Sequence, residues 1–279
     1  MRFEKYLKEK IKQCDGEDVD CFGLTFSPNL EFELKCYKYV VERRDDKIIN
    51  TFVSNNKNIT RCDYKIEYNI RNDYNKICEF INNTIKYNGE LNILFDLWKL
   101  SNKYNNDFRI MEIGTRLDTV HNNCALRGYF SLRCFENDRD VKGKFSNYKN
   151  KKYILHELAS LLNLQKKYLE FIEIKSKSLE KNGYYLSMFG VQKFTEKIEE
   201  KIYFELAEPD NHFNTILNAN IQMIKELIPW RSIDMYEKMK QSILVFWGYG
   251  YFVRGIAFGI LNNEQYSIRL YFSKVESFI

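Results

Sequence analysis

The chain has 279 residues, of which 44% are hydrophobic and 29% charged, a composition typical of a globular protein. Its net charge of +5 is spread along the sequence, and no block of Lys and Arg is long enough to form a nucleic-acid-binding tail. The seven cysteines are scattered away from the three histidines, which predicts reduced core residues and no zinc site. The first 20 residues lack the pattern of a signal peptide, and the longest apolar runs are too short to cross a bilayer, so we expect a cytoplasmic protein.

We expect a single domain over residues 1–279, because the chain has only three prolines and no Gly- or Ser-rich linker. Apolar residues at helical spacing predict several amphipathic helices. Within 153–166, for example, Ile154, Leu158 and Leu161 share one side. In chain order, the predicted helices are 2–13, two over 73–104, 153–166, 213–228 and 232–242.

Strand pairs are predicted between these helices, each around a short turn rich in Asn, Gly or Pro. The pairs are 20–28 with 31–41, 108–117 with 124–135, 168–176 with 183–190, and 250–260 with 264–275. Further strands are predicted at 47–53, 61–69 and 202–207. The alternation of helices and hairpins indicates a repeat architecture.

Three hairpins share a motif: a glycine in the first strand and a basic-x-Tyr pair in the second. The copies are Gly23 with Lys35-x-Tyr37, Gly114 with Arg127-x-Tyr129, and Gly255 with Arg269-x-Tyr271. A weaker fourth copy has Glu173 and Lys175 in its first strand and Tyr185 in its second. Recurrence at matched positions favours a shared function for these pairs.

Residues i and i+2 of a strand lie on one face, so each basic residue and its tyrosine point away from the apolar residues beside them. Helices would cover the apolar face, and the basic-x-Tyr face would line a sheet that curls into a closed barrel. Lys35, Arg127, Lys175 and Arg269 would then converge and repel one another by roughly a few kcal/mol. Arginine binds phosphate oxygens bidentately, so the cluster predicts an anion site.

Each part of the motif also has a structural alternative. Basic residues and tyrosines are common on the solvent face of antiparallel sheets, where they pair with Glu on neighbouring strands. The three glycines could mark bends or bulges, which a barrel also requires.

The order of elements and the basic-x-Tyr pairs together resemble the aromatic and peptide prenyltransferases of the ABBA barrel type. The copies that carry the resemblance are Lys35-x-Tyr37, Arg127-x-Tyr129 and Arg269-x-Tyr271. The resemblance implies an α+β fold in which α-α-β-β units close an antiparallel barrel of about ten strands, with helices outside. It also implies transfer of a prenyl group, dimethylallyl or geranyl, from its diphosphate to an electron-rich acceptor, either an aromatic small molecule or a peptide side chain.

The resemblance also implies roles for individual residues. The diphosphate would be held by Lys35, Arg127, Lys175 and Arg269. The prenyl cation would be shielded by Tyr37, Tyr129, Tyr185 and Tyr271. Glu33 and Glu173 are the candidate bases, since each would share a strand face with a proposed cation, and a cross-strand ion pair is the alternative for each. Magnesium could neutralise part of the diphosphate, although no DDxxD motif is present.

The chain departs from the family pattern in two places. Residues 191–249 give one clear strand where a hairpin is expected, and the third copy has Tyr185-x-Ser187 in place of a basic-x-Tyr pair. A different function therefore stays open: a non-enzymatic sheet that binds single-stranded nucleic acid through Arg and Tyr. In that case the basic-x-Tyr pairs would lie on an exposed open face. A structural protein without a ligand is a third possibility.

Overall fold

The computed structural model of the chain describes most of its regular elements. The described residues are 3–14, 19, 21–27, 32–37, 40–44, 47–53, 59–66, 96, 99–100, 102–104, 107–118, 123–132, 135–136, 139–140, 148–161, 166–193, 198–207, 213–227, 233–261 and 264–274. No helix within these ranges is long and apolar enough to cross a membrane.

Eight strands form the main sheet, and every neighbouring pair in it is antiparallel. In spatial order they are β2 (Phe32–Tyr37), β1 (Cys21–Phe26), β13 (Glu264–Lys274), β12 (Tyr251–Leu261), β11 (Ile198–Leu206), β10 (Tyr184–Lys193), β7 (Asn123–Ser131) and β6 (Arg109–Asp118). A second sheet contains β3 (Val40–Arg44), β4 (Lys47–Val53) and β5 (Ile59–Ile66). The short strands β8 (Phe135–Glu136) and β9 (Arg139–Asp140) pair with each other.

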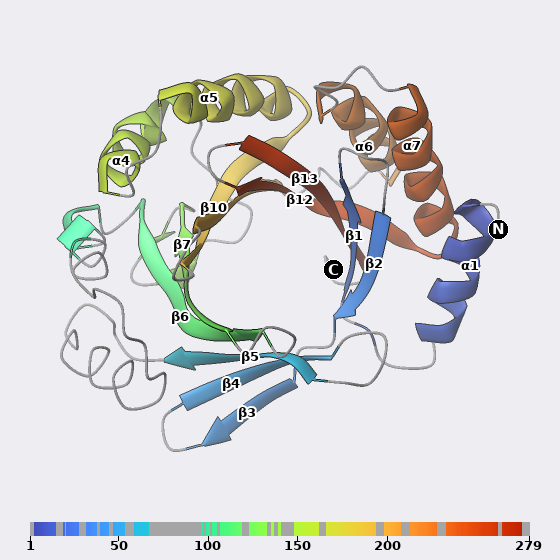
Figure 1. Cartoon of the computed structure of the whole chain (residues 1–279). Coiled ribbons are helices and arrows are strands. Elements are labelled where there is room, and N and C mark those ends of the chain that lie inside the picture. Colours follow the sequence, from blue (N-terminus) through green and yellow to red (C-terminus); the bar gives the residue numbers. More distant parts are fainter. Residues whose placement is uncertain are drawn as a thin grey trace.

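The helices lie outside the curled main sheet (Figure 1). They are α1 (Phe3–Cys14), α4 (Tyr148–Leu161), α5 (Lys166–Glu180), α6 (Phe213–Leu227) and α7 (Ile233–Gly248). Two consecutive units have the order α-α-β-β, namely α4-α5-β10-β11 and α6-α7-β12-β13. The predicted α+β class, with an antiparallel sheet and helices on its outside, is therefore confirmed.

The main sheet is open along its hydrogen bonds. Pairing runs from β2 at one end to β6 at the other and does not join these two strands to each other. The three-stranded sheet lies near both ends, with β5 beside β6 and β4 close to β2. A closed barrel of about ten strands is thus not shown by the described strands.

The core lies between the helices and the outer face of the main sheet. Strict alternation on β13 buries Ile268, Leu270 and Phe272 completely, as the sequence predicts. Phe272 stacks on Phe246 of α7 at 3.9 Å between ring centroids. Full burial of such side chains contributes about 1.5–3 kcal/mol each, so this layer holds the helices to the sheet.

One predicted strand is wrong. Residues 168–176 belong to helix α5, whose residues Tyr168, Ile172 and Leu179 are buried at helical spacing. The alternation of polar and apolar residues within the segment imitated a strand over a few positions only. The hairpin partner of β10 is instead β11, which extends the single strand predicted at 202–207 back to Ile198.

The remaining predicted helices agree with the structure apart from their ends. Helix α4 begins at Tyr148, five residues before the predicted start, and α7 continues to Gly248 rather than ending at 242. Of the two helices predicted over 73–104, residues 73–95 lie outside the described ranges. The described residues 96, 99–100 and 102–103 are helical.

Candidate functional site

The candidate site lies on the face of the main sheet that points away from the helices, which we call the inner face. The alternation of β13 puts Arg269 and Tyr271 on this face, opposite the buried Leu270. Antiparallel register carries the same face across the sheet, since Arg269 pairs with Ala257 of β12 and Ala257 pairs with Tyr203 of β11.

Four tyrosines form a continuous row across the inner face, which we call the tyrosine row. Its members are Tyr37 of β2, Tyr271 of β13, Tyr203 of β11 and Tyr129 of β7. Successive ring centroids lie 6.2, 6.1 and 6.0 Å apart, and the ring planes are tilted or perpendicular to one another. These are favourable distances for aromatic pairs, each worth about 0.5–1.5 kcal/mol beyond the area buried.

The tyrosines come from every second strand, and this needs an explanation. Strands two apart in a sheet are separated by about 9.5 Å, yet the rings approach to about 6 Å. The rings must therefore lean over the strand between them. Each intervening strand carries a glycine on the inner face: Gly23 on β1, Gly255 on β12 and Gly190 on β10.

The space above Gly23 and Gly190 is occupied by the row itself. A Cβ atom on Gly23 would lie 2.7 Å from the ring of Tyr37, and one on Gly190 would lie 2.8 Å from the ring of Tyr129. Both approaches are too close for real side chains. In the first copy of the motif the glycine thus leaves room for the tyrosine of the same copy, whereas Tyr129 lies over Gly190, and a Cβ on Gly255 would meet no ring of the row. The alternative of a bulge also holds at Gly255, where the β12–β13 register shifts.

Arg269 lies beside three members of the tyrosine row, Tyr37, Tyr271 and Tyr203, and is held by side-chain hydrogen bonds. Its Nε donates to Oγ1 of Thr25 at 2.6 Å, and its Nη1 donates to the hydroxyl of Tyr37 at 3.1 Å. Burial disfavours the charged guanidinium and alone would lower its pKa, but the phenol oxygens of Tyr271 and Tyr37 outweigh it and raise the pKa above its ordinary value. Arg269 is therefore a fixed positive charge.

A second cation stands beside this centre. Lys35 lies on the inner face of β2, opposite Gly23, and its Nζ forms an ion pair with Glu33 Oε2 at 3.1 Å. The Lys35 side chain is 33% exposed and that of Glu33 is 59% exposed. The cation and the candidate base are thus side by side and accessible, and the ion pair of Glu33 joins two residues of β2 rather than crossing to a neighbouring strand, as the alternative for Glu33 predicted.

Two residues of the site, Lys201 and Tyr203, are not among those predicted from the sequence. They form a further basic-x-Tyr pair on β11, and Lys201 stands opposite Gly190 in the register. Gly23 and Lys35 are opposed in the same way. The available signal was Gly190 followed 11 residues later by Lys201-x-Tyr203, close to the spacing in the other copies. Because β10 is predicted from the sequence to pair with 168–176, its real partner β11 is not recognised as the second strand of a hairpin, and this copy of the motif is overlooked.

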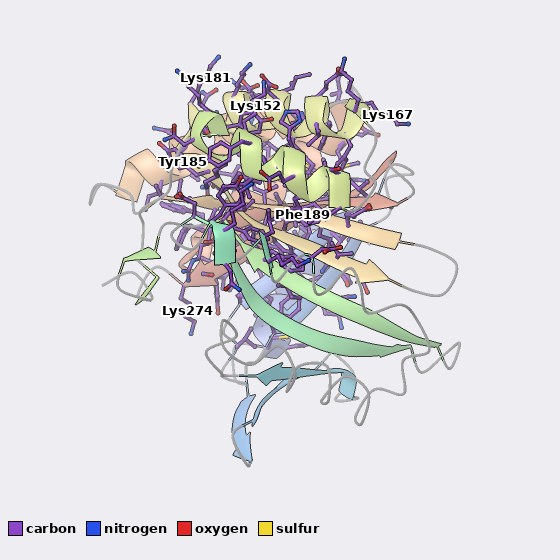
Figure 2. The ribbon with its side chains drawn as sticks, turned by 90° about the vertical axis from the view of Figure 1, so that its left-hand side faces the viewer. Lys152, Lys167, Lys181, Tyr185, Phe189 and Lys274 are labelled. Atoms are coloured by element: carbon purple, nitrogen blue, oxygen red, sulfur yellow. The ribbon has the colours of Figure 1, made fainter. Side chains whose placement is uncertain are left out.

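Two predicted site residues lie elsewhere. Glu173 is on the outer helix α5, where it pairs with Lys177 at 2.7 Å and with Lys152 at 3.4 Å. Lys175, also on α5, is buried, and its Nζ donates to the backbone carbonyl of Glu226 on α6. In Figure 2, Lys152, Lys167 and Lys181 mark this helical layer. Roles for Glu173 and Lys175 in the site were therefore wrong.

The last two predicted residues are placed by their strands. Arg127 is described by its backbone alone; it is opposite Gly114 and Gln192 in the register, two residues before Tyr129. Tyr185 is half-buried on β10, opposite Glu205. In this hairpin the tyrosine row takes its member from the second strand, at Tyr203, so Tyr185 has no place in the row.

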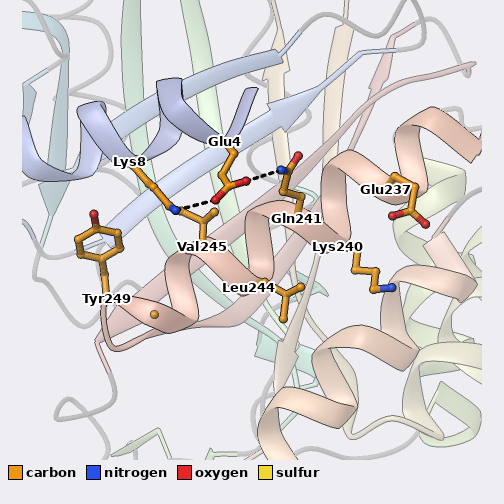
Figure 3. A pocket seen from close by; sticks show the side chains of 9 residues that line it. Glu4, Lys8, Glu237, Lys240, Gln241, Leu244, Val245 and Tyr249 are labelled. Atoms are coloured by element: carbon orange, nitrogen blue, oxygen red, sulfur yellow. Dashed lines mark hydrogen bonds and ion pairs between the residues drawn. The ribbon is translucent and has the colours of Figure 1, made fainter. Parts of the chain in front are cut away.

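A groove on the outside of the molecule is the main rival location (Figure 3). It measures about 740 Å³ and lies between α1 and α7. Glu4 binds Lys8 at 2.6 Å and accepts a hydrogen bond from Gln241 at 2.9 Å, while Glu237 and Lys240 also line the groove. The lining thus carries two carboxylates and two amines, so it lacks the excess of positive charge that an anion site needs.

Neither known protein families nor curated proteins match this sequence. Among the described residues, no group of three or more His, Cys, Asp or Glu side chains is arranged to hold a metal ion.

Proposed function

We propose that this chain is a prenyltransferase that binds an allylic prenyl diphosphate on the inner face. The observation that carries the proposal is the setting of Arg269. Its described hydrogen-bond partners, Thr25, Tyr37 and Tyr271, are neutral hydroxyls, so its charge is not balanced by a carboxylate among them. A desolvated cation of this kind binds an anion more strongly than an exposed one does.

The diphosphate would occupy the donors that Arg269 has left. A guanidinium has five N–H donors; Thr25 and Tyr37 take two of them, and Tyr271 is a further side-chain hydrogen-bond partner. The Tyr37 hydroxyl, which accepts from Arg269, would line the same anion site. Lys35, Lys201 and Arg127 lie on the same face of neighbouring hairpins. The two lysines would add point charges near the diphosphate, and Arg127 would add a second guanidinium that can bind two phosphate oxygens at once.

The tyrosine row would serve the organic half of the donor. Breaking the C–O bond sends the electron pair to the diphosphate and leaves an allylic cation. Aromatic faces attract a cation by about 0.5–2 kcal/mol each, and four rings in a row also keep water away. The acceptor, an aromatic small molecule or a peptide side chain, then forms a bond to the allylic carbon and loses a proton. Glu33, beside Lys35, would be the base that takes this proton.

Two further parts of the proposal concern the surroundings. The three-stranded sheet would complete a barrel by bridging β6 and β2, the strands beside which it lies. A magnesium ion would be held mainly through the diphosphate and would neutralise part of its charge; among the described residues no group of three or more His, Cys, Asp or Glu side chains is arranged to hold a metal ion.

The burial of the tyrosine row favours this function over the nucleic-acid alternative. Tyr37, Tyr129 and Tyr203 are each only 8% exposed. Stacking of bases on a sheet requires open aromatic faces, whereas a small prenyl group needs an enclosed aromatic surface.

Thermal melts with inorganic pyrophosphate and with a prenyl thiodiphosphate test the binding step. A ligand at a hundredfold excess over its dissociation constant stabilises the native state by about 2.7 kcal/mol. For a chain of this size we expect a rise in melting temperature of about 5 °C or more. Absence of any shift at millimolar ligand, with or without magnesium, would overturn the diphosphate site.

Variants of Arg269 test the assignment within the site. Arg269→Ala should abolish the ligand-induced shift and lower prenyl transfer, followed by mass spectrometry, by roughly a hundredfold or more. Arg269→Lys should recover only part, because a point charge replaces a fork. Arg254→Ala is the matched control, since Arg254 is exposed on the neighbouring strand β12. Equal turnover in all variants would make Arg269 an ordinary structural arginine.

A further inference from the structure

Two cysteines meet where helix α1 packs against the end strand of the main sheet. The contact between α1 and β2 is aromatic: Phe32 lies edge-on to Phe3 at 4.7 Å and to Tyr6 at 5.4 Å between ring centroids. This packing sets the last residue of α1, Cys14, against Cys36 on the helix-facing side of β2. Their Sγ atoms are 2.6 Å apart.

The separation is informative about what the pair can do. Non-bonded heavy atoms are most stable about 3.5–4.0 Å apart, and two thiolates on one zinc ion, at about 2.3 Å from the metal, would be almost 4 Å apart. At 2.6 Å the two reduced thiols are in direct contact and closer than in either arrangement, so an S–S bond between them requires only a small movement. The two residues are 22 positions apart in the sequence, so the fold has brought them together.

We propose that Cys14 and Cys36 are an oxidation site that forms an intramolecular disulfide when the protein meets a peroxide. One thiol loses its proton, and its thiolate attacks the peroxide; an S–O bond forms, the O–O bond breaks, and the hydroxide that leaves takes up this proton as water. The second thiol loses its proton, and its thiolate attacks the sulfur of the sulfenic acid; the S–S bond forms, the S–O bond breaks, and the hydroxide that leaves takes up the second proton as water. The two thiols are oxidised by two electrons in total, and one hydrogen peroxide is reduced to two water molecules.

The disulfide ties α1 to the strand that carries Lys35 and Tyr37. Cys36 lies between these two site residues but faces the helices, so the bond would form on the side away from the candidate site. Closing a loop of this length restricts the unfolded chain, and the oxidised form should melt roughly 5 °C higher than the reduced form. Both cysteines are mostly buried, 8% and 9% exposed, which disfavours capture by bulky thiols.

Cys21 provides a matched control within the same part of the fold. It is also buried, but it lies on the inner face of β1, opposite Tyr37, and so on the other side of the sheet from the pair. Cys21→Ser should therefore leave the disulfide unchanged, whereas Cys14→Ser and Cys36→Ser should each abolish it.

Peptide mapping of the full chain after treatment with a slight molar excess of hydrogen peroxide tests the proposal. Remaining thiols are alkylated without reduction, and cleavage after glutamate separates Cys14 from Cys21 because Glu17 lies between them. We expect one cross-linked peptide joining Cys14 to Cys36, lacking two hydrogen atoms, which dithiothreitol reverses together with the rise in melting temperature. Alkylation of both cysteines after oxidation, or a link from Cys14 to Cys21 instead, would overturn the proposal. Wild-type mapping decides this even if a serine variant fails to fold.

Discussion

Replacing the buried carboxylate Glu200 should change how the stability of this protein depends on pH. Glu200 lies on the helix-facing side of β11 and is only 4% exposed. Its Oε2 has no hydrogen-bond partner among the described residues. The buried hydroxyl of Tyr168 on α5 also has none among them. Burial raises the pKa of Glu200 from 4.5 to about 7, with a backbone hydrogen bond opposing the rise only in part.

The sign and the size of the effect follow from proton linkage. The folded protein keeps the Glu200 proton up to about pH 7, whereas the unfolded chain releases it near 4.5. Between these values folding takes up a proton, so the free energy of unfolding falls as the pH rises, and the loss is complete above pH 7. At about 1.4 kcal/mol per pH unit, the interval corresponds to about 3 kcal/mol.

Glu200→Gln keeps the shape of the side chain and is neutral at every pH. We expect wild type and variant to be about equally stable near pH 4.5 and the variant to be about 3 kcal/mol more stable above pH 7. Urea denaturation from pH 4.5 to 9 at constant ionic strength measures the difference between the two curves. Glu237→Gln on α7 controls for the loss of one exposed negative charge. Parallel curves for wild type and Glu200→Gln would refute the reasoning.

The remaining predictions concern the stability of the site and of its support, measured by chemical denaturation. Gly190→Ala should cost about 1–3 kcal/mol because the new Cβ would meet the Tyr129 ring at 2.8 Å. Gly248→Ala, with nothing within 4 Å, should change stability by no more than about 0.5 kcal/mol, and equal effects would contradict the packing argument. Asn220→Ala should cost about 3 kcal/mol of stability. It removes the hydrogen bonds of the Asn220 side chain to the Tyr184 hydroxyl and to the backbone N–H and C=O of Val253 on β12. Asn218→Ala on the exposed side of α6 is its control, and a small effect of Asn220→Ala would show that water replaces the amide.

The faces of the strands could be predicted because the period of a strand is short and unambiguous. If 31–41 and 264–275 are strands, Lys35 shares a face with Tyr37, and Arg269 shares a face with Tyr271. The structure adds the ring contact between Tyr37 and Tyr271 at 6.2 Å and the hydrogen bond from Arg269 to Tyr37. The prediction that these hairpins converge therefore holds for the first and the last copy of the motif.

The whole site could not be predicted from the sequence, because one segment fits both the two-residue period of a strand and the longer period of a helix. Residues 172–175 alternate like a strand, and only the longer spacing of Tyr168, Ile172 and Leu179 reveals the helix α5. This error displaced the third hairpin by one strand and hid Tyr203. The contact between Cys14 and Cys36 was likewise out of reach, since it depends on the angle at which α1 crosses β2 and no local pattern encodes that angle.

The glycines explain why the inner face is more than a surface that happens to contain tyrosines. Glycine within a strand is less stable than alanine by about 0.5–1 kcal/mol, so Gly23, Gly190 and Gly255 together cost about 2 kcal/mol. A sheet whose tyrosines pointed into solvent would gain nothing from them. Here Gly23 leaves room for the ring of Tyr37, and Gly190 leaves room for the ring of Tyr129. The stability lost at these glycines is offset by the contacts of the two rings with Tyr271 and Tyr203 on other hairpins. Because the row is continuous only when all of these contacts form, the repeat is best understood as the means of building one aromatic surface around Arg269.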